Sequence, residues 1–330
     1  MLGITSGRGR STYRLVCVLA VVVLVTPLAQ KAAKAAPKVD FPKKNITWIV
    51  PYAPGGGYDV YSRAIARMMP KYLPKKVDII VRNLPGAGGM RAYHTLMRSK
   101  ADGHTIGIVN IQGMAVLMIM GKSKLDPTQF TYLGTIIQDI GTFMVAANSP
   151  FNKLEDLQKA EKVLFGSTGP PSLSWVAPTL ARRILKIRAE IVTGYGGSSD
   201  FSAGMIRGDV HACFMGATSA LPYVQAGEAK VPVAFKKTPL LPDAPYIEEG
   251  SPYREISIVE EDRVVAAPPG VPNEITRMLE DALLKTMQDE EIQKWSKTTG
   301  RILTPLSGKE TAELGAELLK TYKKHAEAFR

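Results

Sequence analysis

The sequence predicts an α/β protein built on mostly parallel sheets, and two observations carry this prediction. Short apolar runs alternate with segments that have one apolar helical face, which is the pattern of a parallel sheet flanked by helices. Four loops rich in glycine or serine also stand between such a run and the helix that follows it. In a parallel sheet these loops gather at the carboxyl ends of the strands, where ligands bind.

The first two loops lie near the start of the mature chain. Ile46–Val50 is a predicted strand, and Gly55–Gly57 leads from it into a helix with apolar residues on one face. Val77–Val81 is the next strand, followed by the glycine-rich loop Asn83–Gly89 and another helix. Thr105–Val109 is a third strand.

The middle of the chain repeats the pattern. The strand Lys162–Phe165 leads into the loop Gly166–Ser172 and a helix. The strand Glu190–Thr193 leads into Gly194–Asp200 and a helix that ends near Arg207. Further strands are predicted at Val210–Met215 and Val231–Phe235, and the chain is expected to be helical from Asn273 onward.

Residues 1–35 have the features of a cleaved secretory signal peptide. Arg8, Arg10 and Arg14 precede the uncharged run Leu15–Ala29, and Ala33–Ala35 gives the A-x-A pattern of a cleavage site. The alternative is a permanent anchor, which needs about 20 apolar residues. The mature protein is therefore expected in the periplasm.

Composition limits the classes of partner. The chain of 330 residues is long enough for two domains, and removal of the leader lowers its formal net charge from +12 to +7. A modest basic excess attracts anions at long range, but the lysines are scattered and do not form a nucleic-acid-binding stripe. Cys213 is the only cysteine left after cleavage, so no intrachain disulfide is expected.

Motif spacing argues against cofactors and against common kinds of catalysis. The dinucleotide pattern G-x-G-x-x-G fails at Val60 and at Arg91, and the P-loop pattern fails at Val116. The four histidines stand in different elements, with no metal-ligand spacing, and no G-x-S-x-G motif is present. No catalytic residue, metal or cofactor is predicted. The acidic run Glu260–Asp262 is interpreted as solvated surface.

Backbone chemistry remains as a way to bind a ligand. A glycine-rich loop at a helix start exposes unpaired N–H groups beside the positive end of the helix dipole. That geometry holds an anion without a cationic side chain. The loops at Gly55–Gly57 and Gly86–Gly89 are therefore predicted to clamp a carboxylate.

The residues resemble a known family, the extracytoplasmic solute receptors of tripartite tricarboxylate transporters, also called Bug receptors. Three blocks carry the resemblance in order, namely Val50–Gly57 with Asp59, Asn83–Gly89 and Asp102–Thr105. It continues through Tyr195-Gly196-Gly197, Gly208-Asp209-Val210, Leu221-Pro222, Leu241-Pro242-Asp243-Ala244-Pro245, Ala267–Pro272 and Gly300, and so covers essentially the whole mature chain.

The resemblance implies a type II-like periplasmic binding fold of two domains joined by crossing strands. Domain 1 would comprise residues 36–140 and 264–330, and domain 2 residues 141–263. The protein would be monomeric, would bind a small carboxylate, and would act with a large and a small membrane subunit. It is expected to need no cofactor, metal or nucleic acid.

The resemblance also supplies the candidate ligand-binding residues. The N–H groups of Gly57, Tyr58, Gly88 and Gly89 would hold the carboxylate, while Asp59 braces its loop. The second domain would select the rest of the ligand. The full set is Tyr52, Gly56, Gly57, Tyr58, Asp59, Gly86, Ala87, Gly88, Gly89, Ser167, Thr168, Ser172, Tyr195, Ser198 and Asp200.

Two departures bear on ligand identity. The loop Gly169–Trp175 carries two prolines and an indole where the family usually has glycine, serine and a histidine, and His104 replaces a common tyrosine. No particular ligand is therefore carried over. Trp175 and Tyr195 either stack on ligand or pack in the core, and an amino or hydroxyl group is expected on the ligand if Asp200 contacts it. Two other functions stay open: a sensory receptor for a signalling protein, and an exported enzyme acting on a small acid.

Overall fold

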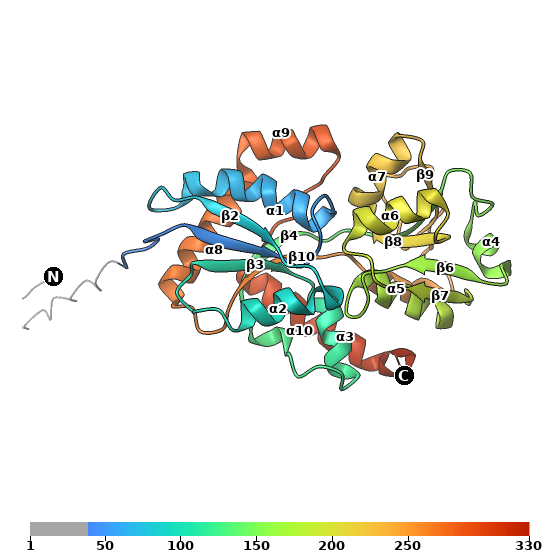
Figure 1. The fold of residues 1–330 in the computed structure, drawn as a ribbon, viewed down its shortest axis with the longest axis horizontal. Helices are drawn as coiled ribbons and strands as arrows, with labels where there is room; N and C mark the ends of the chain where they lie inside the picture. The colour runs from blue at the N-terminus through green and yellow to red at the C-terminus, as the bar shows by residue number, and fades with distance from the viewer. Residues whose placement is uncertain (1–38, 330) are drawn as a thin grey trace, which may run out of the picture. The chain divides into compact units, whose positions relative to one another are not determined.

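The computed structural model describes residues 39–329, which form two β-sheets with helices packed on both faces of each (Figure 1). The predicted α/β class is confirmed. The predicted signal peptide lies outside the described residues. Within residues 39–329, no helix combines the length and the apolar character that crossing a membrane would require.

The first sheet has six strands in the order β11-β4-β10-β3-β1-β2. Its strands are β1 (Ile46–Val50), β2 (Ile79–Asn83), β3 (Thr105–Val109), β4 (Thr131–Ile137), β10 (Arg263–Ala267) and β11 (Leu306–Ser307). Its helices are α1 (Gly57–Met68), α2 (Met90–Met97), α3 (Ile111–Ile119), α8 (Asn273–Gln288), α9 (Glu290–Thr299) and α10 (Gly308–Lys324). We call this sheet and its helices the first lobe.

The second sheet has five strands in the order β7-β6-β8-β5-β9. Its strands are β5 (Gly141–Ala146), β6 (Val163–Gly166), β7 (Ala189–Val192), β8 (Ala212–Gly216) and β9 (Ala229–Ala234). Its helices are α4 (Leu154–Lys159), α5 (Leu173–Arg183), α6 (Ser198–Arg207) and α7 (Ala217–Gln225). We call this sheet and its helices the second lobe. Short 3₁₀ helices lie at Met69–Tyr72, Ala87–Gly89, Pro127–Gln129, Arg254–Ile258 and Ala326–Phe329.

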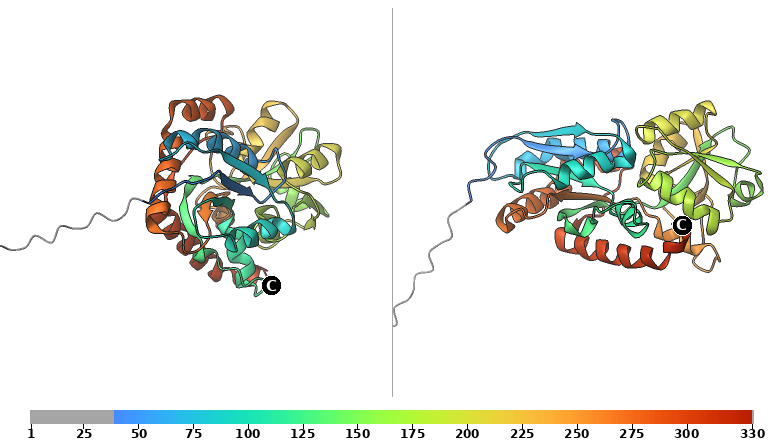
Figure 2. Two further views of the ribbon diagram at one scale, coloured as in Figure 1. Left: turned by 60° about the vertical axis from the view of Figure 1, so that its left-hand side comes forward. Right: turned by 60° about the horizontal axis from the view of Figure 1, so that its bottom comes forward.

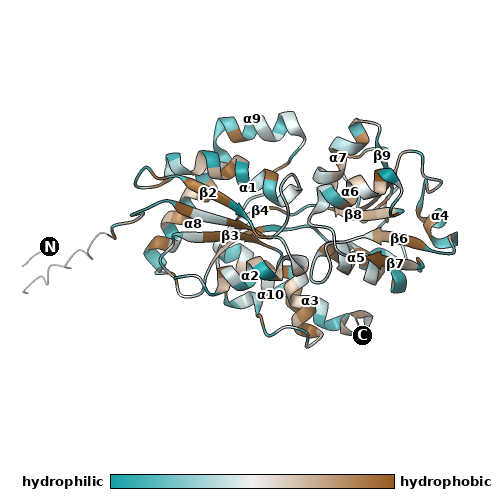
Figure 3. Cartoon of the chain, in the orientation of Figure 1, coloured by the Kyte–Doolittle hydropathy of each residue, from teal (hydrophilic) through white to brown (hydrophobic). Residues whose placement is uncertain are grey.

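Side chains alternate between the two faces of each sheet, and helices bury both faces. In β1, Trp48 and Val50 lie in the cluster formed with α1 and α8, whereas Ile49 lies in the cluster with α2 and α3. In β8, Phe214 packs with α5, and Cys213 packs on the opposite face with α6 and α7. Figure 3 shows the result as apolar strands between helices, with hydrophilic residues along the outer helix α9.

Each sheet mixes parallel and antiparallel pairs. β1 pairs in parallel with β2 and β3, and β6 pairs in parallel with β7 and β8. β10 runs antiparallel to β3 and β4, and β5 runs antiparallel to β8 and β9. β5 and β10 each follow a crossing between the lobes, and the short strand β11 also pairs antiparallel with β4 at the edge of the first sheet.

The chain crosses between the lobes twice, and the two crossing segments touch. The first crossing joins β4 to β5 through residues 138–140, and the return reaches β10 through residues 260–262. The Glu261 N–H donates to the Asp139 carbonyl at 2.7 Å, and Ile140 forms a bridge with Glu260. These bonds hold the crossing segments side by side.

The C-terminal segment makes a further connection. α10 packs on β4 and α3 in the first lobe, and the chain then continues toward the second lobe (Figure 2). Tyr322 and Phe329 belong to the apolar cluster around β6 and α5. The end of the chain thus stabilises the second lobe as well as the first.

Most predicted elements lie where the sequence placed them. β1 and β3 match residue for residue, and β2 begins two residues later than predicted. The pattern did not reveal β4, β5 or β10, which are the strands that flank the crossings.

Candidate ligand-binding site

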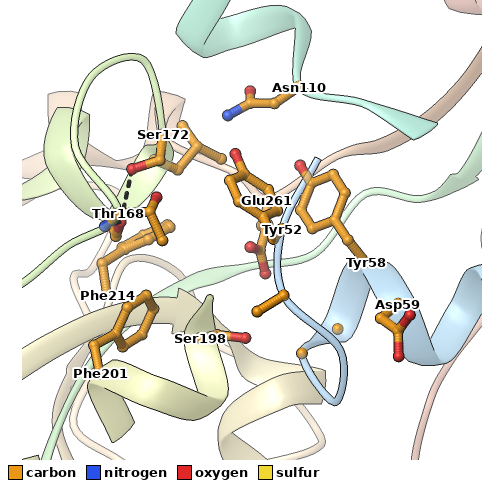
Figure 4. A pocket seen from close by; sticks show the side chains of 15 residues that line it. Tyr52, Tyr58, Asp59, Asn110, Thr168, Ser172, Ser198, Phe201, Phe214 and Glu261 are labelled. Carbon is orange, nitrogen blue, oxygen red and sulfur yellow. Dashed lines mark hydrogen bonds between the residues drawn. The ribbon is translucent and has the colours of Figure 1, made fainter. Parts of the chain in front are cut away.

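A cavity lies where the βα loops of the two lobes meet (Figure 4). Its volume is about 30 Å³, which accommodates one or two water molecules. The lobes are closed on each other, because the Ala53 N–H of the first lobe donates to the Gly196 carbonyl of the second at 2.9 Å. The cavity is lined by Tyr52, Ala53, Gly56, Gly57, Tyr58, Asp59, Asn110, Thr168, Ser172, Leu173, Ser174, Ser198, Phe201, Phe214 and Glu261.

Four helices begin at this cavity, two from each lobe. Gly56 and Gly57 start α1, and Asn110 caps α3 by accepting a hydrogen bond from the Gly113 N–H at 3.0 Å. Ser172 is the N-cap of α5, and Ser198 is the first residue of α6. The residues at these helix starts that line the cavity are Gly56, Gly57, Asn110, Ser172 and Ser198. The positive ends of four helix dipoles thus converge on one small space.

Among residues 39–329, the cavity lining contains no lysine, arginine or histidine, and its acidic residues are Asp59 and Glu261. An anion there would be held by backbone N–H groups, hydroxyls and helix dipoles. Each helix end stabilises a nearby negative charge by about 0.3–1 kcal/mol, and by up to ~2 kcal/mol when partly buried. The arrangement therefore suits a small anion such as a carboxylate.

The first-lobe wall is braced by Asp59. Its Oδ2 accepts hydrogen bonds from the Gly55 N–H and from Arg63 Nε, both at 3.0 Å, and its Oδ1 accepts one from Asn83 Nδ2 at 2.9 Å. Although burial raises the pKa of Asp59, the bonds from Arg63, Gly55 and Asn83 outweigh it and lower the pKa. Asn83 Nδ2 also donates to the Tyr52 carbonyl at 2.9 Å. The carboxylate thus ties β1, β2 and α1 together.

The glycines of the first loop allow close approach by other parts of the protein. A Cβ on Gly57 would lie 2.5 Å from Arg263 Nη2 and 2.6 Å from Ser219 Oγ, and a Cβ on Gly56 would lie 2.5 Å from Ser198 Oγ. Real Cβ atoms do not make such contacts. Glycine here therefore permits the lobes to close around the cavity.

The second glycine loop meets the opposite lobe in the same way. Gly88 has φ +61°, and a Cβ there would overlap the carbonyl oxygens of Gly169 and Pro170. In this closed arrangement the loop Gly86–Gly89 packs on the Gly169–Pro171 loop, beside the cavity rather than on its wall.

The second-lobe wall is rich in hydroxyls. Ser174 Oγ lies 2.7 Å from Ser172 Oγ and 3.1 Å from Ser167 Oγ, and it accepts from the Thr168 N–H at 3.2 Å. Thr168 Oγ1 is buried and has no hydrogen-bond partner among the described residues. A buried hydroxyl without a partner costs free energy, and a ligand in the cavity would supply that partner.

Tyr52 adds a neutral donor to the first-lobe wall. Its hydroxyl lies 3.3 Å from the hydroxyl of Tyr93. Burial raises the pKa of Tyr52 to about 12, so the phenol keeps its proton at neutral pH. It can therefore donate a hydrogen bond to an anion.

The interpretation of Glu260–Asp262 as solvated surface is wrong. Asp262 is buried, and the Glu261 side chain is only 15% exposed. Glu261 pairs with the fully buried Arg263, which also pairs with Asp139 at 3.1 Å. The guanidinium stacks on Tyr61 at 4.9 Å. The acidic run thus lies at the crossing between the lobes, with Glu261 on the cavity wall.

The chain matches a known protein family over most of its length. The family model described as tripartite tricarboxylate transporter family receptor matches residues 61–326. The chain belongs to this receptor family. A relative from Pseudomonas sp. strain P51, described as a UPF0065 protein in the tcbD-tcbE intergenic region, is 26% identical over 275 residues, covering 79% of each chain.

Solved structures share the fold of this receptor. The periplasmic binding protein BugD superposes with a TM-score of 0.77 at 22% identity, covering 88% of this chain and 97% of that one. MatC from Rhodopseudomonas palustris, solved with bound malate, superposes with a TM-score of 0.76 at 21% identity, covering 88% of this chain and all of that one. The predicted two-domain periplasmic binding fold is thereby supported.

Eight of the fifteen predicted binding residues lie on the cavity wall of the receptor: Tyr52, Gly56, Gly57, Tyr58, Asp59, Thr168, Ser172 and Ser198. Their contact with a ligand stays a prediction. The loop Gly86–Gly89, Ser167, Tyr195 and Asp200 are not part of the wall. Asp200 instead accepts from the Gly196 N–H at 3.0 Å. Neither Trp175 nor Tyr195 lines the cavity, and both pack against apolar clusters of the second lobe.

The predicted residue set omits seven wall residues, of which Leu173 and Ser174 lie in the loop Ser167–Ser174 that was expected to select the ligand; the others are Ala53, Asn110, Phe201, Phe214 and Glu261. Asn110 had a usable signal, because it directly follows the predicted strand Thr105–Val109, at a carboxyl end where ligands bind. Glu261 had no such signal, because its burial depends on Arg263 and on the first crossing segment.

Proposed function

We propose that the protein is a periplasmic receptor that binds an organic carboxylate between its two lobes and delivers it to a tripartite tricarboxylate-type membrane importer. The observation that carries this proposal is the convergence of four helix N-termini on one cavity whose wall has no cationic side chain. Membership of a receptor family and the fold shared with malate-bound MatC support it.

In this proposal the carboxylate accepts hydrogen bonds from the N–H groups of Gly57 and Tyr58. No residue in the range 39–329 accepts a hydrogen bond from either group in the closed structure. Tyr52 and Thr168 add hydroxyl donors from opposite lobes. Binding of one anion by groups of both lobes would stabilise the closed state.

Opening and closing would occur at the crossing segments. Domain 1 would comprise residues 36–140 and 264–330, and domain 2 residues 141–263. The contact between loops of the two lobes supports this motion, because the Ala53 N–H donates to the Gly196 carbonyl at 2.9 Å beside the cavity. The membrane partners would be a large and a small subunit that recognise the closed, loaded receptor.

A thermal-unfolding screen of the mature chain tests the binding step. A ligand that binds only the folded state stabilises it, by about 2.7 kcal/mol at a concentration of 100 times Kd. Dicarboxylates, tricarboxylates, aromatic acids and acidic amino acids are the test compounds, with neutral sugars and organic cations as controls. We expect a rise in Tm with a carboxylate and none with the controls. A rise with a sugar or a cation alone would overturn the proposal.

Two measurements extend the test. Small-angle scattering should show that the apo protein in solution includes an open state and that the carboxylate reduces its radius of gyration. Uptake of the same labelled carboxylate by cells should require both the receptor and its membrane subunits. Normal uptake in cells without the receptor would contradict the transport role.

A further inference from the structure

Glu261 carries an unused acceptor into the cavity. Its Oε2 accepts from the Gly216 N–H at 3.0 Å and from Arg263 Nη2 at 2.9 Å. Its Oε1 accepts no hydrogen bond from any residue within 39–329. The residue lines the same cavity as the four helix N-termini (Figure 4). One oxygen of the carboxylate is thus held by the protein, and the other has no hydrogen-bond partner among the described residues.

Glu261 shares its ion-pair partner, Arg263, with a second carboxylate. Arg263 is fully buried and pairs with both Glu261 and Asp139, whose side chains are 15% and 1% exposed. Asp139 is further held by the N–H and hydroxyl of Thr218. One guanidinium therefore pairs directly with two carboxylates, although Arg301, which donates to the Thr218 carbonyl at 3.2 Å, is a second cation near Asp139. A ligand that offers a positive charge or a hydrogen-bond donor to Glu261 would be attracted there, whereas a plain carboxylate would be repelled.

From this geometry we infer that Glu261 is a specificity-determining residue and that the ligand is a carboxylate carrying a hydrogen-bond donor. The donor is an ammonium or a hydroxyl group, and the carboxylate of Glu261 favours the ammonium. The ligand carboxylate would lie at the helix N-termini, and the donor would lie at Glu261 Oε1. This inference rests on the proposed function and names the substrate class of the same cavity.

Neighbouring acids do not fill this role. Asp200 was the acid that the sequence placed near the ligand, but it is exposed, lies off the cavity wall and accepts from the Gly196 N–H. Glu260 forms an ion pair with Lys236 outside the cavity. Asp59 lines the cavity, but both of its oxygens are already bonded. Only Glu261 among these acids presents a free oxygen to the cavity.

Acids that differ only in one substituent test the inference. Succinate, malate and aspartate share a carbon skeleton and carry hydrogen, hydroxyl and ammonium at the same carbon. Glutarate, 2-hydroxyglutarate and glutamate extend the skeleton, and propanoate, lactate and alanine shorten it. Calorimetric titration of the wild-type mature protein with each series needs no variant. In the series that fits, we expect affinity to rise from hydrogen to hydroxyl to ammonium, by about tenfold or more overall.

Glu261→Gln tests the residue itself, and Glu260→Gln is its matched control. Glu261→Gln should reduce the preference for ammonium over hydrogen to about twofold or less. Glu260→Gln should keep the wild-type preference. Thermal unfolding without ligand establishes whether each variant is folded. If Glu261→Gln does not fold, the order of wild-type affinities for the three acids of a series remains the test of the inference.

The outcomes separate this inference from the proposed function. Equal binding of the three members of a series by the wild type, or an unchanged preference in Glu261→Gln, overturns the inference and leaves the carboxylate receptor intact. Absence of binding by every acid overturns both.

Discussion

Two loops that face each other across the cavity share one local design. In the first lobe the Gly55 N–H donates to Asp59, and in the second the Gly196 N–H donates to Asp200, at 3.0 Å in each case. Both aspartates stand in the first turn of a helix that begins at the cavity. The loops also touch, because the Ala53 N–H donates to the Gly196 carbonyl at 2.9 Å.

The surroundings of the two aspartates differ. Asp59 is buried and also bonded to Arg63 and Asn83, whereas Asp200 is exposed and has no second partner among the described residues. The first loop is therefore fixed by the strands beneath it. The second is held mainly by its own turn and by contact with the opposite lobe. A rigid wall that holds a common carboxylate and an adaptable wall that reads the rest of the ligand would suit a family of receptors with different ligands.

The largest predicted difference is between Asp59→Ala and Asp200→Ala. Asp59→Ala leaves the Gly55 N–H, Asn83 and Arg63 without their shared acceptor. We expect the free energy of unfolding to fall by about 3 kcal/mol, which is the low end for a broken buried ion pair, because Arg63 is half-exposed. Asp200→Ala removes one exposed turn bond and should cost below about 1 kcal/mol. Urea unfolding of both variants measures the difference, and equal losses would show that the loops are equally braced.

A second contrast concerns closure at the other glycine loop. Gly88→Ala would place a methyl group against the carbonyl oxygens of Gly169 and Pro170, so that the lobes cannot close fully. We expect carboxylate affinity to fall by about 100-fold, or ~2.7 kcal/mol. Gly121→Ala is the matched control, because its φ of +67° is close to the +61° of Gly88 and nothing lies within 4 Å. A similar loss of affinity in both variants would assign the effect to backbone strain rather than to closure.

The support behind the first loop should respond to pH. The Tyr58 hydroxyl donates to the Asp262 carbonyl at 3.2 Å. Burial is the main cause that raises the pKa of Asp262, from 3.8 to about 7. The folded state therefore binds more protons than the unfolded state between these values. Stability should accordingly fall as pH rises from about 4 to 7, by at most ~1.4 kcal/mol per pH unit from this group.

Asp262→Asn isolates that contribution. The amide resembles the protonated carboxyl and does not titrate, so the variant should lose the downward slope and be at least as stable as the wild type at pH 7. Urea unfolding at intervals between pH 4 and 7 compares the two proteins. An unchanged slope in the variant would mean that Asp262 is ionised throughout this range.

The loops around the cavity also show which features can be predicted from the sequence. The apolar run Ile46–Val50 ends at Pro51, and β1 has those bounds. The glycine-rich loops were predicted to leave the backbone open to a ligand at Gly56, Gly57 and Gly88, and in the closed structure another group of the protein lies close to each. The approaching group is Arg263 or a residue of the opposite lobe. A glycine pattern predicts that the backbone needs space around it, but it does not identify the group that fills this space.

Glu261 illustrates the opposite case. In the sequence it is the middle residue of an acidic run, and such runs are usually solvated. Its burial depends on Arg263 and on Asp139, which lies more than a hundred positions earlier and reaches the site only because the crossing segments lie together. β4 and β5 also escaped prediction, since neither is followed by a glycine loop that leads into a helix.

The smallest predicted effect is that of Thr168→Val, which tests whether the second-lobe wall adapts to the ligand. Thr168 Oγ1 is buried without a partner among residues 39–329, so Thr168→Val replaces a hydroxyl that the empty protein does not use. We expect the free energy of unfolding without ligand to stay the same or rise slightly. Carboxylate affinity should fall by about tenfold, because the ligand loses one donor. Thermal unfolding and calorimetric titration measure the two quantities on the same preparation. Thr179→Val is the control, since Thr179 donates only to the Trp175 carbonyl within α5 and lies off the cavity wall. A stability loss in Thr168→Val would instead indicate that its hydroxyl supports the fold, and unchanged affinity would indicate that it faces no ligand atom.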